Sequence, residues 1–129
     1  MILEIEGIPT PQTRPRVSKA GHFYSDASPK LKEWKKAIKV QAKEQCEAII
    51  PKGTFIQIGF YFLFPRPQKA AHKFPSRCDL DNLIKAVKDA LTGIVWEDDR
   101  WVVDYLFAQK RYCPNGSKPG VILNITPVD

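Results

Sequence analysis

The sequence contains little cysteine, and its few cysteines follow no metal-binding spacing. The three are Cys46, Cys78 and Cys113, an odd number without the short intervals of a zinc site. They favour a protein of the reducing cytoplasm over one built on a disulfide framework.

Long apolar stretches, internal repeats and low-complexity tails are also lacking. The N-terminal MILEIEG has neither a basic region nor a long apolar core, so no secretory signal is expected. The most apolar run, Thr54 to Phe64, is too short for a membrane helix. We therefore expect a cytoplasmic protein without a membrane segment, and its 129 residues suit one domain, residues 1–129, with a modest core.

Acidic residues are the minority among the charged ones. The chain has 20 Lys and Arg against 14 Asp and Glu, which gives a net charge of +6. This excess fits a polyanionic partner, although small basic domains without such a partner exist.

The most informative stretch runs from Asp79 to Trp101, DLDNLIKAVKDALTGIVWEDDRW. Its apolar residues follow the i, i+3, i+4, i+7 spacing of an amphipathic helix: Leu80, Leu83, Ile84, Val87 and Leu91. Asp79 occupies the expected N-cap position, where its carboxylate can accept a backbone hydrogen bond. Thr92-Gly93 is expected to close the helix, with Gly93 just beyond its end.

The acids of this stretch have two interpretations. Asp79 and Asp81 suit an ordinary helix start, and Asp98-Asp99 suits a solvated turn. Together, however, they could supply the oxygen ligands that Mg²⁺ requires, if the next strand returns beside the helix start. Lys85 lies one turn from Asp81 on the same face, where a cation could stabilise the charge of a phosphoryl transition state.

The rest of the chain predicts an α+β fold, with a mixed sheet of about four strands and two main helices packed on it. A second helix is expected to start at Ser28-Pro29, with a buried stripe that continues to Cys46 and Ile49. Thr54 to Phe64 is apolar on both faces, which is typical of a central strand. The other expected elements are a strand at Ile2 to Glu6, a hairpin at Arg16 to Tyr24, and strands at Trp101 to Tyr112 and Gly120 to Thr126. Asn115-Gly116 predicts that the last two strands form an antiparallel hairpin.

Two basic, proline-containing loops are candidates for contacts with the phosphates of a polyanionic partner. Pro9 to Arg16 carries Arg14 and Arg16, and the fourteen-residue loop Pro65 to Cys78 is long enough to indicate a function. The cations of the second loop that could bind backbone phosphates are Arg66, Lys69, Lys73 and Arg77. The alternative interpretation is that these charges only keep surface loops soluble. His72 in the same loop is an exposed histidine that we do not assign to the chemistry.

One family shares the motifs Asp79-Leu80-Asp81-Asn82-Leu83 with Lys85, then Asp89-Ala90-Leu91, then Trp96-Glu97-Asp98-Asp99 followed by Val102-Val103. The chain resembles the RusA family of Holliday junction resolvases, which are small Mg²⁺-dependent endodeoxyribonucleases often carried by prophages. Weaker similarity at Arg14-Pro15-Arg16 and Lys110 extends the resemblance over most of the chain.

The resemblance implies a site and a reaction. Asp79, Asp81 and Asp99 would be the metal ligands, with Asp98 as an auxiliary acid, Lys85 as a catalytic cation, and Lys110 as a DNA contact. The chemistry of the residues alone leaves open whether Asp98 or Asp99 is the closer ligand. Mg²⁺, with Mn²⁺ as a substitute and no small-molecule cofactor, would support hydrolysis to a 5′-phosphate and a 3′-hydroxyl.

The implied substrate is a four-way DNA junction, nicked symmetrically by a homodimer, because a two-fold junction needs two matched cuts. Two other functions stay open at this point. One is a metal-dependent nuclease for flap or other branched DNA, and the other is a DNA-binding module with an inactive site.

Overall fold

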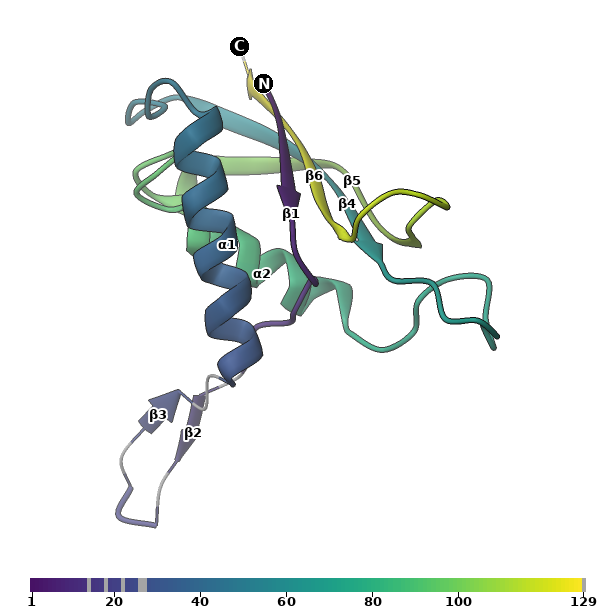
Figure 1. The fold of residues 1–129 in the computed structure, drawn as a ribbon. Helices are drawn as coiled ribbons and strands as arrows, with labels where there is room; N and C mark the ends of the chain where they lie inside the picture. Colours follow the sequence, from purple (N-terminus) through teal and green to yellow (C-terminus); the bar gives the residue numbers. More distant parts are fainter. Residues whose placement is uncertain (14, 18, 22, 26–27, 129) are drawn as a thin grey trace.

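The computed structural model describes residues 1–13, 15–17, 19–21, 23–25 and 28–128. Its larger sheet joins β1 (Ile2–Glu6), β4 (Phe55–Phe64), β5 (Val102–Tyr112) and β6 (Gly120–Val128). The helices are α1 (Pro29–Gln45), α2 (Leu80–Leu91) and the short 3₁₀ turn η1 (Asp99–Trp101). A small antiparallel pair, β2 (Pro15–Val17) and β3 (Phe23–Ser25), confirms the predicted hairpin and projects beyond the end of α1 (Figure 1).

Helix α1 begins where its sequence predicts. The Ser28 hydroxyl accepts a hydrogen bond from the Leu31 backbone N–H at 3.2 Å, and Pro29 is the first helical residue. The buried stripe consists of Leu31, Trp34, Ile38 and Ala42. The predicted continuation of this stripe to Ile49 is wrong, because the helix ends at Gln45 and the Ile49 side chain is 40% exposed.

Helix α2 also has the predicted bounds, with Asp79 at the N-cap and Gly93 just beyond its end at φ +89°. Its buried face contains Leu83, Ile84, Ala86, Val87, Ala90 and Leu91. However, the Asp79 carboxylate does not accept the capping hydrogen bond that its position allows. The carboxylate of Asp79 is therefore not engaged by the helix start.

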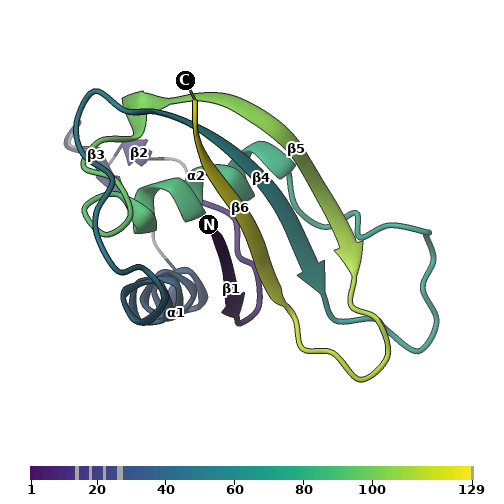
Figure 2. The same ribbon diagram turned by 90° about the horizontal axis from the view of Figure 1, so that it is seen from above.

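The strand order β1-β6-β4-β5 confirms that β4 is a central strand. Strand β4 is antiparallel to β6 and parallel to β5 (Figure 2). The predicted hairpin between the last two strands is wrong, because β4 lies between them. The reason is the β4–α2–β5 crossover, which returns the chain parallel to β4 and fills the position beside it. The connection at 113–119 then crosses the end of β4 to reach β6.

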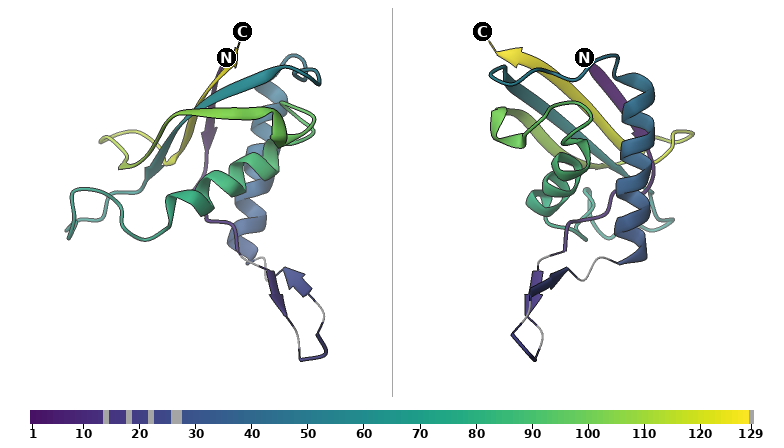
Figure 3. Two further views of the ribbon diagram at one scale, coloured as in Figure 1. Left: turned by 180° about the vertical axis from the view of Figure 1, so that it is seen from behind. Right: turned by 90° about the vertical axis from the view of Figure 1, so that its left-hand side faces the viewer.

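Both helices cover the same face of the sheet (Figures 2 and 3). The core between them and the sheet includes the fully buried Ile56, Ile58, Phe60 and Phe62 of β4. Lys35 of α1 donates to the Asp89 carboxylate of α2 at 2.6 Å, which links the two helices at the surface. These layers confirm the α+β class. No helix in the described part of the chain is long and apolar enough to cross a membrane.

Two glutamines of α1 cover the exposed edge of β1. The Gln41 side-chain amide accepts from the Glu6 N–H at 2.7 Å and donates to the Glu6 carbonyl at 2.8 Å. Gln45 makes the same pair of bonds with Glu4, at 2.9 and 2.8 Å. Glutamines one helical turn apart therefore occupy the backbone groups that another strand would use.

Replacing both glutamines by alanine is expected to leave the edge of β1 open and to promote self-association. The four hydrogen bonds lost are solvent-exposed, so we expect a loss of only about 1–3 kcal/mol in unfolding free energy. Light scattering against protein concentration would measure the association. The matched control is Lys39→Ala on an exposed position of the same helix. A double variant that scatters like this control would contradict the expectation.

Candidate active site

An open pocket of about 370 Å³ lies between α2, η1 and β5. Its lining residues are Asp81, Ile84, Lys85, Lys88, Asp99 and Tyr105. Two carboxylates and two ammonium groups thus face one solvent-filled space, while the buried Ile84 forms its apolar floor. The pocket carries no net charge from these four side chains.

The helix geometry of α2 accounts for four of the six lining residues, Asp81, Ile84, Lys85 and Lys88. Asp81, Lys85 and Lys88 are spaced by four and three residues, so they lie on one face. This face adjoins the buried stripe, and Ile84 at its border is only 6% exposed. The sequence pattern of α2 therefore specifies both its core face and its charged face.

The first of two irregularities in β5 directs Tyr105 into the pocket. The pairing with β4 skips Val103 and Leu106, and both skipped side chains are exposed. After the first skip Tyr105 pairs with Ile58, whose side chain points to the helix-covered face. Strict alternation from Val102 would have placed Tyr105 on the opposite face, so the bulge determines its orientation.

The turn before β5 distinguishes its two aspartates. The Asp98 carboxylate accepts a hydrogen bond from the Arg100 backbone N–H at 3.0 Å and caps η1. Asp99, the first residue of η1, lines the pocket. The structure thus brings Asp99 to the same pocket as Asp81 and Lys85, and places Asp98 in a structural cap.

Asp79 is the N-cap of α2, and the side chain of Lys110 reaches the same helix start from β5. The exposed Asp79 is not among the lining residues of the pocket. The Lys110 ammonium is partly buried and donates to the Cys78 carbonyl at 2.6 Å, one residue before the N-cap. Burial raises the pKa of the Cys78 thiol, with the nearby Lys110 and Arg77 opposing the shift and Asp79 adding to it. The thiol is therefore protonated at neutral pH and unsuited to nucleophilic chemistry.

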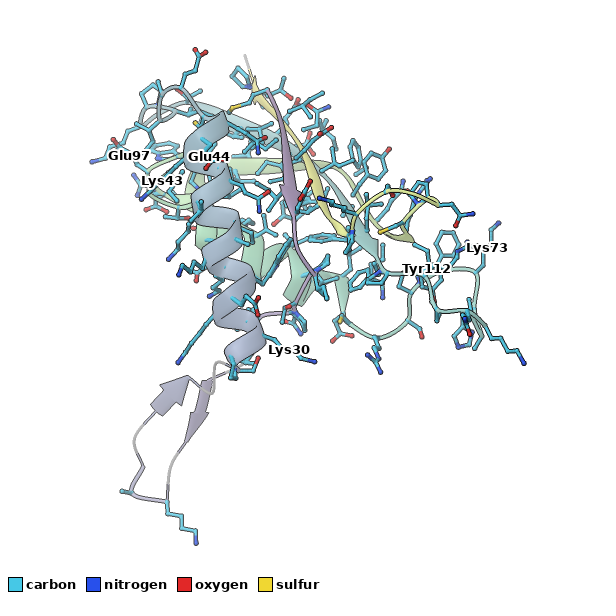
Figure 4. The ribbon with its side chains drawn as sticks, in the orientation of Figure 1. Lys30, Lys43, Glu44, Lys73, Glu97 and Tyr112 are labelled. Carbon is cyan, nitrogen blue, oxygen red and sulfur yellow. The ribbon has the colours of Figure 1, made fainter. Side chains whose placement is uncertain are left out.

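The structure describes the side chains of only some of the residues that are predicted to contact DNA. Lys69, Lys73 and Arg77 are exposed on loop 65–78, which leads directly into α2 (Figure 4 labels Lys73). At the base of this loop the Arg66 guanidinium lies over the Tyr112 ring at 5.6 Å. Arg16 lies in β2, where only its backbone is described, and Arg14 is outside the described residues.

Sequence reasoning missed Lys88 and Tyr105 as pocket residues. Lys88 could have been found, because it lies two helical turns from Asp81 and so on the same face. Tyr105 had no such signal, since a bulge has no reliable pattern in a single sequence.

The donors of the pocket suit a hard divalent cation. Mg²⁺ is typically held by one or two carboxylates together with waters and substrate phosphates, without an all-protein cage. Asp81 and Asp99 offer such oxygens. Within the described ranges, no three His, Cys, Asp or Glu side chains gather into a metal-binding group. All three cysteines are free, as the sequence predicts.

A small α+β domain whose pocket offers carboxylate oxygens and lysines, with an exposed basic loop leading into the same helix, has the groups that metal-assisted cleavage of a phosphodiester uses. The family model for the endodeoxyribonuclease RusA matches residues 6–126, and the chain belongs to this family. RusA proteins are endonucleases that resolve Holliday junctions in DNA recombination, and nucleases of this kind are generally metal dependent. Comparison with curated proteins gives no significant match.

Proposed function

We propose that this protein is a Mg²⁺-dependent endodeoxyribonuclease that resolves four-way DNA junctions by paired symmetric nicks. The observation that carries this proposal is the meeting of Asp81, Lys85 and Asp99 at one open pocket, in a chain matched by the RusA family over most of its length. The net charge of +6 supports a polyanionic substrate.

In this proposal Asp79, Asp81 and Asp99 hold the ion. When bound, Mg²⁺ would activate a water molecule and neutralise charge on the scissile phosphate, which leaves a 5′-phosphate and a 3′-hydroxyl. Mn²⁺ is expected to substitute for Mg²⁺. Asp79 lies outside the pocket lining, but its carboxylate makes no capping bond and can turn towards an ion without breaking the helix start.

The remaining residues position the DNA. Lys85 places an ammonium group in the pocket beside the aspartates, where it offsets the charge that develops on the phosphate. Lys69, Lys73 and Arg77 extend the positive surface along loop 65–78 and would bind flanking phosphates, and Arg14 and Arg16 are expected to do the same. Lys110 acts through the Cys78 carbonyl in this proposal, by fixing the entry to α2.

A homodimer completes the proposal. A four-way junction has two-fold symmetry, and its productive resolution needs two cuts in strands of like polarity. Two copies related by a two-fold axis would supply the two pockets in matching orientation.

The deciding experiment is cleavage of a mobile four-way junction by the wild-type protein, with Mg²⁺ and with EDTA. Matched linear duplex and flap substrates serve as controls. We expect paired nicks on the junction that require the metal ion, and removal of the ion is expected to abolish cleavage while the DNA stays bound.

The other outcomes reject defined parts of the proposal. Equal cutting of linear duplex or flap DNA would keep the metal-dependent site but remove the junction from its function. Tight junction binding without cleavage under any divalent metal would indicate a DNA-binding module instead.

A further inference from the structure

Lys88 and Tyr105 form one wall of the pocket, and neither has a role in the proposed cleavage site so far. The Lys88 ammonium donates to the Tyr105 hydroxyl at 3.0 Å and lies 5.4 Å from the centre of its ring. The Tyr105 ring in turn packs edge-on against the buried Phe60, with ring centres 5.6 Å apart. Lys88 is thus a cation held in place by a side chain that is itself anchored on the core.

Hydrogen-bond capacity remains at this wall. The Tyr105 oxygen accepts from Lys88, so the hydroxyl hydrogen is directed to a different acceptor. An ammonium group has three N–H donors, and Tyr105 uses one of those of Lys88. Neither group makes a second side-chain hydrogen bond to the described residues. The pair therefore presents several donors and a positive charge to the pocket, which suits an anion with more than one acceptor oxygen.

The position of Lys88 along α2 indicates that this anion is a phosphate of the DNA backbone. Lys88 is three residues beyond Lys85, about 4.5 Å further along the helix axis. Side chains three residues apart on a helix have Cβ atoms roughly 5–6 Å apart, and the flexible lysine stems allow the two ammonium groups to contact separate phosphates. If Lys85 serves the scissile phosphate, Lys88 is within reach of the next phosphate on the same strand.

We propose that Lys88 and Tyr105 form a second phosphate-binding subsite, which holds the DNA backbone phosphate adjacent to the one that is cut. This inference rests on the proposed function. The subsite fixes the strand along the pocket, so that the scissile phosphate lies beside Asp81 and Lys85. Both donors touch the substrate, and neither transfers a proton or forms a bond in the reaction.

The test uses Lys88→Met, which removes the charge but keeps the apolar stem, and Tyr105→Phe, which removes only the hydroxyl. Single-turnover cleavage at saturating enzyme is expected to slow about 30-fold for Lys88→Met and about 5-fold for Tyr105→Phe. The double variant should be slowed by less than the product of the two single effects, because the two donors contact each other and serve one phosphate. Lys39→Met and Tyr61→Phe, at positions that do not line the pocket, are matched controls and should cut at the wild-type rate.

Neutral methylphosphonates placed singly at the phosphates around the cut identify the contact. At the neighbouring phosphate, the substitution should slow the wild type about 10-fold and leave the already slow Lys88→Met unchanged. The same sensitivity of both proteins at every position would overturn the subsite, even if both variants are slow. If Lys88→Met fails to fold by circular dichroism, Tyr105→Phe takes its place in the same comparison.

The proposed function has its own readout in this experiment. Wild-type cutting of the unmodified junction tests the nuclease, whereas the methylphosphonate pattern tests the subsite. If the wild type binds the junction without cutting it, the same substitutions are compared by dissociation constant. A selective loss of sensitivity in Lys88→Met would then support the subsite, and an identical pattern would reject it.

Discussion

Asp81→Asn is expected to lower junction cleavage by about a thousandfold, which corresponds to about 4 kcal/mol of transition-state stabilisation. Asp81 is exposed in the pocket, so the substitution removes charge without disturbing the core. Loss of a carboxylate also removes repulsion from phosphates, and junction binding should be retained or tightened. Cleavage in Mg²⁺ and gel-shift binding in EDTA measure the two effects. A folded variant that no longer binds the junction would contradict this expectation.

The two aspartates before β5 provide the matched comparison. Asp99→Asn should behave like Asp81→Asn, because Asp99 lines the same pocket. Asp98→Asn should retain most of the activity, since an asparagine oxygen can still accept the hydrogen bond from Arg100 and cap η1. If Asp98→Asn abolished cleavage and Asp99→Asn retained it, Asp98 rather than Asp99 would be the acid of the site.

Of the substitutions that add a single methyl group, Gly120→Ala is expected to cause the largest loss of stability. A Cβ at this position would lie 1.9 Å from the Ile5 carbonyl oxygen, a backbone atom of the paired strand β1. The strand must shift to relieve this contact, and we expect a loss of about 3 kcal/mol in unfolding free energy. For a chain of this size, the melting temperature should fall by roughly 10 °C. Thermal unfolding followed by circular dichroism measures it.

Gly116→Ala is the control for this substitution. A Cβ at Gly116 would meet no atom within 4 Å, and the cost is confined to its backbone at φ +83°. We expect a loss of about 1 kcal/mol there. Equal losses for the two variants would show that the contact with Ile5 is relieved without cost.

The helices could be predicted because their determinants are local. Ser28 and Pro29 specify the start of α1, and the apolar spacing in Asp79 to Trp101 specifies the buried face of α2. The same spacing places Asp81 and Lys85 on one face. What α2 contributes to the pocket was therefore predictable from sequence.

The contribution of β5 was not predictable, because it depends on which strand β5 pairs with. Asn115-Gly116 favours a hairpin with β6, whereas the structure pairs β5 with β4, through a crossover over α2. The orientation of Tyr105 depends further on the skipped Val103. Pairing partners and bulges are decided by packing between distant segments, and a single sequence does not display that packing.

The hydrogen bond from Lys110 to the Cys78 carbonyl has a mechanical consequence. Loop 65–78 is the basic segment that we expect to grip DNA, and it joins α2 through Cys78. A pull on the loop by a moving DNA arm would reach the first turn of α2, and therefore Asp81, through this residue. The hydrogen bond from Lys110 links this connection between the loop and the helix to β5. Strand β5 is in turn hydrogen-bonded along its length to β4. We therefore expect the sheet to bear part of such a load, so that the pocket keeps its shape.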